Sequence, residues 1–491
     1  MRKLIRRLIR LTLFALVIIV GIATVKTIAF SSKQIQVPEV QTIAIEDAVA
    51  QRLAQSLTFE TISSEAGFDS LPFRQLDTFL QRSFPNVDTI LEKKRIGELT
   101  LLYKWAGKNP KLSPVLLMAH QDVVPISEGT LKEWTFPPFA GRVEDGFIWG
   151  RGAIDDKNSL LGILEAAELL LKEGYQPERS IYFSFGHDEE IGGNAGAEQV
   201  ANYCQQQGIH FEYVLDEAQI VLEEALNGLS PPLAMIGIAE KGYTTLTLTA
   251  QLEEGGHSSM PPKETAVGIL SEAITRLQDN PFPPTIDGAT GAMFDFIGPE
   301  MTPLYKVIFA NRWLTKNILM SQLSGSTSSN ALIRTTTAPT MLRGGIKDNV
   351  LPTRASAKVN FRIIPGETVD QVAERVRKII ADDRVIVAKE PDPKDSAEPS
   401  PISDIDAFGF QVIQTTIQQL FPEVVVAPSL VIAQTDGRHM VPVSDQVYRF
   451  MPVQLAKADL SRFHGTNERI SVEGYKRMIR FYRQLILNSC K

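Results

Sequence analysis

The chain has few of the residues that build disulfide-stapled or thiolate-bound sites. Among its 491 residues there are only two cysteines, Cys204 and Cys490, too few for a disulfide framework or for a metal held by thiolates. Histidine is also scarce, with six copies, so a histidine at the end of an apolar run needs an explanation. A basic surplus is missing too. The net charge of −7 gives no reason to expect nucleic acid as a partner.

A long apolar run occurs at the N-terminus alone. Leu11 to Val25 carry no charge, and the ten residues before them, MRKLIRRLIR, include five basic ones. With help from Leu8 and Ile9 the run approaches the ~20 residues of a spanning helix. Basic residues before it predict a cytoplasmic N-terminus and a translocated body. We therefore expect residues 1–30 to be an uncleaved membrane anchor. A cleaved signal peptide is the alternative, and both place the body in a periplasmic, extracellular or lumenal space.

The rest of the chain exceeds one compact domain, since single cores stop growing near 250–300 residues. From about Ile43 helical and strand-like segments alternate, which predicts an α/β layer structure with a mixed sheet flanked by helices. Near Glu240 the pattern changes, because KGYTTLTLTAQL alternates as a sheet with one exposed face does. We expect a larger domain of residues 41–240 and 400–491, interrupted by an inserted α+β module at 241–392. The Pro-rich stretch 390–401 is the return linker.

Acidic and histidine side chains follow three of the apolar runs. They are His120 and Asp122 after VLLMA, Glu189 and Glu190 after IYFSFG, and Asp216 after EYVL. In open α/β sheets, ligands bind beyond the carboxyl ends of the strands. Carboxylates clustered there would repel one another unless a cation lies among them. One such end is ordinarily a solvated loop, but three of them, together with GRGAIDDK, predict a metal site.

The metal hypothesis assigns a role to each side chain. His120 binds through one ring nitrogen, and Asp122, two residues on, accepts the other N–H and fixes the tautomer. The remaining predicted ligands are Asp155, Glu190, Asp216 and His464. Two histidines and three carboxylates close two tetrahedral sites if one carboxylate bridges, and this favours two Zn²⁺ and a hydrolase. Glu189 precedes the predicted ligand Glu190 and is not itself assigned to the metal. We therefore expect it to be the general base, which later gives its proton to the leaving amine.

Five motifs, HQD, GRGAIDDK, GHDEEIGG, GGHSSMPP and FHGTNE, occur in an order that resembles one family. It is the zinc metallopeptidase family of carboxypeptidase S, aminoacylase and bacterial glutamate carboxypeptidase. WTFPPFAG and DDKNS are similar to its branch of carboxypeptidase S and N-fatty-acyl-amino-acid synthase/hydrolase. The resemblance implies a zinc-peptidase catalytic domain, an inserted dimerisation lid, a homodimer, and two Zn²⁺ per subunit, with Co²⁺ as the alternative metal. It also implies Asp155 as the bridging carboxylate supported by Asp156, with Asp122 and Glu189 as catalytic residues.

Four more positions take roles from the same resemblance. His257 in GGHSSMPP matches the lid histidine that reaches into the partner's active site. Asn349, Arg362 and Arg438 match positions on the substrate side, where an arginine can bind a carboxylate. The apolar stretch 293–323 departs from compact members of the family, and we expect it to shape the substrate pocket for an apolar acyl group.

These observations predict an enzyme that cleaves an amide bond next to a free carboxylate, as a carboxypeptidase or dipeptidase does. Its substrate is a small peptide or an N-acyl amino acid. An N-acyl-amino-acid hydrolase or synthase is the alternative within the family. A catalytically silent binding protein would lack Glu189 or a ligand, and none is missing. A two-metal phosphoesterase is disfavoured because no basic cluster lies near the acidic motifs.

Overall fold

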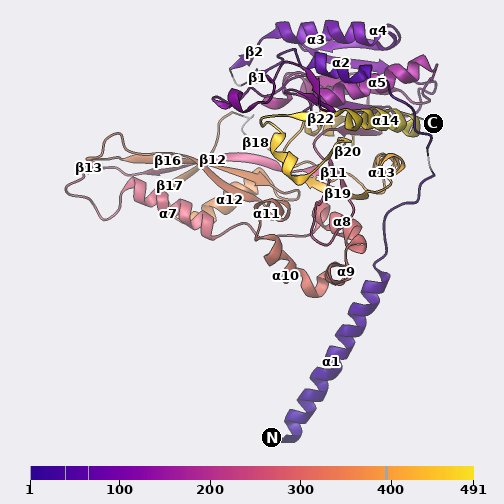
Figure 1. Cartoon of the computed structure of the whole chain (residues 1–491). Coiled ribbons are helices and arrows are strands. Elements are labelled where there is room, and N and C mark those ends of the chain that lie inside the picture. The colour runs from indigo at the N-terminus through magenta and orange to yellow at the C-terminus, as the bar shows by residue number, and fades with distance from the viewer. Residues whose placement is uncertain (1, 39, 65, 393–395, 491) are drawn as a thin grey trace.

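Three parts can be followed in the computed structural model, which describes residues 2–38, 40–64, 66–392 and 396–490. They are the N-terminal helix α1 (Arg2–Ala29), a large α/β body and an arm that extends from it (Figure 1). The linker expected at 390–401 is described in part, since residues 393–395 lie outside these ranges.

A ten-stranded mixed sheet forms the centre of the body. Its strands, in spatial order, are β21 (Gln454–Leu455), β10 (Val221–Leu222), β11 (Leu233–Glu240), β20 (Val447–Arg449), β9 (Tyr213–Asp216), β5 (Val115–His120), β8 (Ile181–Gly186), β4 (Thr100–Trp105) and β3 (Glu92–Ile96), with β19 (Val425–Val431) paired to β11. The neighbours β9, β5 and β8 run parallel, so their carboxyl ends meet at one edge. The predicted fold class is confirmed.

Helices cover both faces of this sheet, as the apolar runs of its inner strands require. Alternate side chains point to opposite faces: Leu117 and Phe183 join the core of one face, and Leu116 and Tyr182 that of the other. Helices of the body are α2 (Ala48–Ser56), α3 (Ser70–Ser83), α4 (Pro85–Ile90), α5 (Lys157–Lys172), α6 (Ala197–Gln206), α13 (Phe408–Leu420) and α14 (Val472–Ser489). The buried helix α5 packs against β5 and α14, and it begins directly after Asp155 and Asp156.

The arm has a sheet and a core of its own. Its strands are β12 (Gly242–Gln251), β14 (Thr336–Arg343), β16 (Arg354–Ile363), β17 (Val385–Lys389) and β18 (Ser396–Ala397). Helices α7 (Ala266–Asp279) and α12 (Val369–Ile380) pack against this sheet, and Leu246 and Leu248 of β12 point into the core between them. At the tip, β13 (Gly256–His257) pairs with β15 (Val350–Leu351).

Part of the segment expected in the insert packs on the body instead. Helices α8 (Gly288–Ile297), α9 (Pro303–Ala310), α10 (Arg312–Leu323) and α11 (Thr327–Ile333) lie between strands of the arm in sequence. Their apolar residues, among them Phe294, Ile297 and Phe309, belong to the core of the body, and α8 packs against β19. The apolar character that distinguished this stretch in the sequence is explained in part by this second packing surface.

Smaller elements complete the body. They are β1 (Ser63–Ser64), β2 (Gly67–Phe68), β6 (Arg142–Glu144), β7 (Phe147–Trp149), β22 (Arg469–Ser471) and the 3₁₀ turns η1 (Thr130–Glu133), η2 (Glu189–Ile191), η3 (Gly298–Glu300), η5 (Asp436–Val443) and η6 (Lys457–Arg462).

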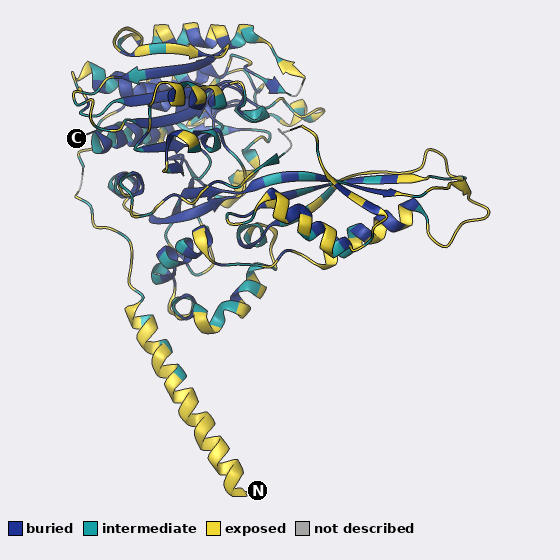
Figure 2. Cartoon of the chain, turned by 180° about the vertical axis from the view of Figure 1, so that it is seen from behind, coloured by how far each residue is buried: buried dark blue, intermediate teal, exposed yellow. Residues whose placement is uncertain are grey.

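Helix α1 projects from the body and is exposed along its length (Figure 2). It has 28 residues, none of those described is buried, and its central window has a mean hydropathy of 2.5. By length and composition it can cross a membrane.

Candidate active site

The carboxyl ends of β5, β8 and β9 open into a cavity of about 710 Å³. His120 is the last residue of β5, and Glu189 and Glu190 follow β8 in the turn η2. The cavity walls include Asp155, Glu189, Glu190, Glu217 and His464. The structure therefore brings together side chains that the sequence placed after separate strands.

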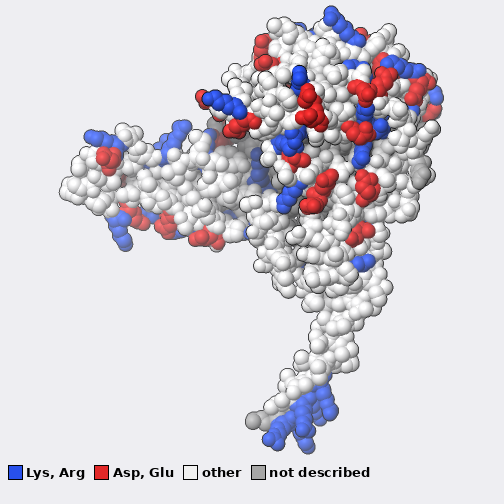
Figure 3. Space-filling model, in the orientation of Figure 1, with Lys and Arg blue, Asp and Glu red and all other residues white. Residues whose placement is uncertain are grey.

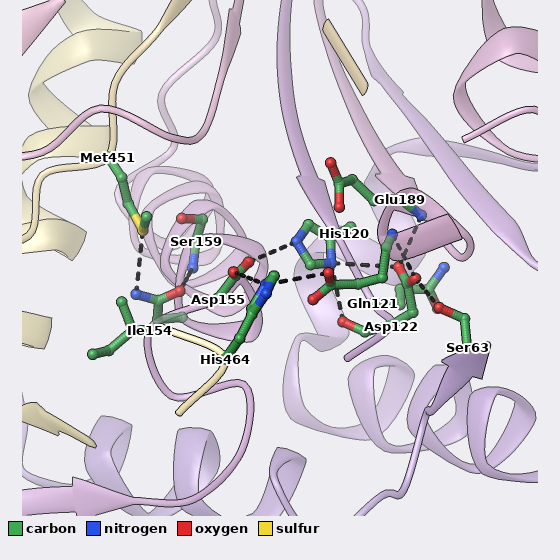
Figure 4. Close-up of polar contacts among 12 residues, drawn as sticks. Ser63, His120, Gln121, Asp122, Ile154, Asp155, Ser159, Glu189, Met451 and His464 are labelled. Carbon is green, nitrogen blue, oxygen red and sulfur yellow. Dashed lines mark hydrogen bonds and ion pairs between the residues drawn. The ribbon is translucent and has the colours of Figure 1, made fainter. Parts of the chain in front are cut away.

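The carboxylate of Asp155 lies between two imidazoles (Figure 4). Its Oδ1 is 3.0 Å from Nε2 of His120, and its Oδ2 is 3.0 Å from Nε2 of His464. Glu190 completes this side, with Oε2 3.3 Å from the same nitrogen of His464. One carboxylate therefore contacts two imidazoles, an arrangement that is compatible with a ligand shared by two cations.

Asp122 connects the end of β5 to the turn after β8. Nδ1 of His120 is 3.0 Å from the carbonyl oxygen of Asp122 and 3.3 Å from its Oδ1. The carboxylate also accepts the backbone N–H groups of Glu189, at 3.2 Å, and Glu190, at 3.1 Å. Ser63 donates its hydroxyl to the same carboxylate. Asp122 thus holds the ring of His120 and the backbone of both glutamates.

A buried ion pair holds the loop that carries Asp155. Arg151 and Glu468 meet at 2.7 Å, and Oε1 of Glu468 accepts the backbone N–H groups of Ile154 and Asp155. Arg151 also donates to the carbonyl oxygen of His464 at 3.0 Å. Sequence reasoning missed Ser63 and Glu468. The latter is the last letter of the quoted motif FHGTNE, so its place beside His464 was the available signal.

Glu217, the neighbour of the expected ligand Asp216, also lies in the cluster. Ligand atoms of His120, Asp156 and Glu217 lie within 4.8 Å of one another. Oδ2 of Asp216 instead accepts the backbone N–H of Gly437 at 2.5 Å. The chain turns just after β9, where Ala218 has φ 94°. Which of two adjacent acids enters the cavity depends on this turn, and strand alternation does not predict it.

Burial and close charges shift the acidity of the cluster. Burial alone would lower the pKa of His120, but hydrogen bonds to Asp122 and Asp155 raise it well above its usual value. Hydrogen bonds to Asp155 and Glu190 raise the pKa of His464 to about 10. Burial raises the pKa of Glu189 and Glu217 well above the ordinary range. Buried carboxylates this close together repel one another as anions, so the cluster favours bound protons or cations.

Unpaired buried oxygens fit a cation better than protons. Within the described part of the chain, both carboxylate oxygens of Asp156 and Oε1 of Glu190 are buried without a hydrogen-bond partner. A second cluster of ligand atoms is formed by His120, Asp155 and Glu190, again within 4.8 Å of one another. Imidazole and carboxylate donors at these spacings suit divalent metals such as zinc.

Two arginines line the same cavity. Arg362 comes from β16, and its guanidinium lies over the ring of Tyr243 at 5.4 Å from the centroid. Arg438 donates to the carbonyl oxygen of Gly192 at 2.5 Å and to Gln434 at 3.1 Å. Positive charge therefore lines the same cavity as the acidic cluster, and a guanidinium group can bind a carboxylate.

His257 and Asn349 lie at the tip of the arm and not among the residues that line the cavity. His257 is exposed, with Nδ1 2.8 Å from Oγ of Ser259. The carbonyl oxygen of Asn349 accepts the N–H of Ser258 at 3.1 Å. Figure 1 places this tip at the end of the arm that points away from the central sheet. The chain does not bring its own His257 to its own cavity.

The fold and the site together define a hydrolase with a carboxylate-rich metal centre at the strand ends. The sequence pattern of peptidase family M20/M25/M40 matches residues 116–488. The chain belongs to this family and is a metallopeptidase, as its motifs indicated.

Individual proteins agree with this assignment. Probable carboxypeptidase S-like 2 of Dictyostelium discoideum is 42% identical over 481 residues, covering 95% of this chain and 91% of the relative. N-fatty-acyl-amino acid synthase/hydrolase of Xenopus tropicalis is 41% identical over 446 residues, covering 90% and 86%. The crystal structure of an M20 family metallo-carboxypeptidase from Sulfolobus solfataricus has a TM-score of 0.64 at 17% identity, covering 90% of this chain and 99% of that one.

The choice between Asp216 and Glu217 can be tested with matched amide variants. We expect Glu217→Gln to lower bound metal from about two ions to about one per chain, because a ligand of one position is lost. Asp216→Asn should keep both, since its amide oxygen still accepts the N–H of Gly437. Elemental analysis after dialysis measures the metal. The reverse pattern would restore Asp216 as the ligand.

Proposed function

We propose that this protein hydrolyses the amide bond next to a free carboxylate in small peptides, as a carboxypeptidase or dipeptidase. The observation that carries the proposal is the single cavity that joins the carboxylate shared by His120 and His464 to the guanidinium groups of Arg362 and Arg438. A metal-binding cluster and carboxylate-binding arginines in one cavity fit a substrate whose scissile bond is close to its own carboxylate.

Two metal positions share Asp155 in this proposal. One is held by His120, Asp155 and Glu217, the other by Asp155, Glu190 and His464, with Asp156 as a supporting acid. Zinc suits these nitrogen and oxygen ligands, and Co²⁺ prefers similar ones. Bound divalent cations supply Lewis acidity to the scissile carbonyl and make water more acidic.

The proton transfers fall to Glu189. Asp122 accepts the backbone N–H of Glu189 (Figure 4), which fixes the backbone that carries this side chain, and the residue lines the cavity. Its carboxylate takes a proton from the attacking water and gives it to the leaving amine. Burial that raises the pKa of Glu189 suits a group that must both accept and release a proton.

An N-acyl amino acid is the alternative substrate. It has the same amide and carboxylate, with an acyl chain in place of the first residue. Ile191, Tyr243 and Phe463 give the cavity an apolar wall, and the Xenopus relative carries the name of such an activity. Among the described residues that line the cavity there are none from 293–323, so this apolar stretch does not form the acyl wall expected of it.

The exposed His257 suggests that each active site is completed by a second chain. The arm keeps His257 outside its own cavity, whereas in a two-fold dimer the tip can enter the cavity of the partner. A donor there would stabilise the oxyanion of the tetrahedral intermediate. Asn349, beside it at the tip, would accompany it.

Helix α1 is proposed to anchor the body to a membrane, on the side away from the cytoplasm. It has the length and hydropathy of a spanning helix, and its basic residues precede the apolar run. Its C-terminal end contacts the body at Asn311, and from there the helix projects outward, as Figure 2 shows.

Recognition of the free carboxylate predicts a strong preference between matched substrates. Amidation of the C-terminus should lower kcat/KM by about 10- to 100-fold, because hydrogen bonds to a charged group are lost. Arg362→Gln should remove most of this preference, whereas Arg142→Gln, an exposed arginine outside the cavity, should keep it. Hydrolysis of dipeptides, N-acyl amino acids and their amides by each variant measures the ratio. Equal hydrolysis of acid and amide by the unaltered protein would refute the proposed function.

Sharing of the site between chains predicts complementation. Glu189→Gln should keep its metal and lose turnover by about 10²–10⁴-fold, and His257→Ala should be nearly inactive too. After free exchange of subunits, half the dimers are mixed, and each mixed dimer holds one site with both original residues. About a quarter of all sites should then recover activity. Exchange without recovery would show that His257 does not act on the partner.

A further inference from the structure

Helices α9 and α10 present an apolar surface to solvent. Leu304 and Ile318 are each 69% exposed, and Val307, Trp313 and Leu314 are between 44% and 52% exposed. We call these five residues the α9–α10 face. Large apolar side chains grouped on a soluble surface mark a site that binds something apolar.

The face is formed by the outer sides of two helices whose inner sides are already used. On α9, Leu304 and Val307 are three residues apart and point outward, while Phe309 is buried in the core of the body. On α10, Leu314 and Ile318 are four residues apart and exposed, while Leu319 is buried. Each helix is therefore apolar on two sides. Packing on the body accounts for the inner side of each helix but not for the outer, exposed side.

This face lies beside the upper end of α1. Nδ2 of Asn311, between the two helices, donates to Oγ1 of Thr27 at 3.0 Å and to the carbonyl oxygen of Ala23 at 3.3 Å. Nζ of Lys26 lies 5.6 Å from the centre of the Trp313 ring. In Figure 1, α9 and α10 form the end of the body from which α1 projects.

Helices α9 and α10 contact α1 at the point where its apolar stretch ends. Leu11 to Val25 are 15 uncharged residues, about 22 Å of helix at 1.5 Å per residue, and Lys26 follows. If α1 crosses a bilayer, Lys26 and the Trp313 beside it lie at the outer head groups. Tryptophan and lysine are the side chains that favour this depth.

The charged residues of the two helices also fit a position at the head groups of a membrane. Residues 301–323 include three cations, Lys306, Arg312 and Lys316, and no acid. The lower end of the body above α1 is largely free of charged side chains on the side seen in Figure 3. Arg312 and Lys316 are paired with acids of the preceding segment, Asp295 and Asp287, so Lys306 and the Lys26 of α1 supply the remaining positive charge. An apolar face with lysines at its edge is typical of segments that lie in the interface of a membrane with anionic lipids.

We propose that the α9–α10 face docks on the bilayer that α1 crosses, so that the body rests on the membrane surface through a second contact. The proposal depends on the membrane anchor proposed above. It gives the apolar stretch 293–323 a role on the outside of the molecule, since one side of it packs on the body and the other binds lipid. The docked face would hold the body in one orientation instead of letting it pivot on the segment after α1.

Spin labels on the full-length protein in nanodiscs of phosphatidylcholine and phosphatidylglycerol test the docking. The natural cysteines are both buried, so a nitroxide can be placed on Leu304→Cys or Ile318→Cys. Leu131→Cys, an equally exposed leucine on η1 at 63%, is the matched control. We expect collisions with oxygen, relative to a water-soluble nickel chelate, to be several-fold more frequent at 304 and 318 than at 131.

Labels at 304 and 318 that are as accessible to the chelate as the label at 131 would overturn the docking. Spin–spin broadening at 318 without access to oxygen would indicate a second copy of the chain on this face, and would overturn it too. A separate label on Val17→Cys reports the anchor itself. A label at 17 in lipid with 318 in water would refute the docking and leave the anchor standing, whereas a label at 17 in water would overturn both, because the docking depends on the anchor.

Discussion

The shared carboxylate of Asp155, with an imidazole on each side, is the contact on which the rest of the site depends. It requires that one strand end and two loops meet at one point, since His120 ends β5, Asp155 lies in the loop before α5 and His464 in the loop after η6. The surrounding acids are buried, and some of their oxygens have no hydrogen-bond partner among the described residues. Such a group is stable as anions only when cations lie inside it. The ion pair of Arg151 and Glu468 serves this requirement by fixing the backbone that presents Asp155.

Much of this arrangement could be predicted from the sequence because it follows from strand chemistry. Parallel strands buried on both faces appear as short apolar runs, and the residues after them meet at one edge of the sheet. For that reason His120, Glu189 and Glu190 were placed correctly beside one another. The sequence did not point to Glu217, whose carboxylate lies with His120 and Asp156 in the structure, because a strand pattern does not show which of two adjacent acids after the strand enters a cavity.

The division of the chain was harder to predict for a related reason. Apolar periodicity shows that a helix has a buried side, but it does not say which core that side joins. The arm was recognisable from the sequence of strand β12. There, apolar residues such as Leu246 and Leu248 on one face alternate with threonines on the other. Helices α8 to α11 carry no such mark, so their packing on the body was visible in the structure alone.

Two of the proposals concern contacts beyond the chain, and they are compatible with each other. The tip of the arm holds His257 away from its own cavity. Helix α1 and the α9–α10 face form an apolar surface with lysines beside it. Together they suggest a dimer that rests on a membrane, with each cavity completed by its neighbour. Neither contact supplies a metal ligand, so metal binding can be examined separately from the assembly, whereas turnover depends on the partner's His257.

Anomalous diffraction at the zinc edge from crystals of the zinc-loaded protein tests the central claim most directly. The account predicts two peaks per chain about 3.5–4 Å apart. Asp155 should lie between them, with His120 and Glu217 at one and His464 and Glu190 at the other. A single peak, or two peaks of which Asp155 touches only one, would contradict the bridging carboxylate and with it the proposed organisation of the site.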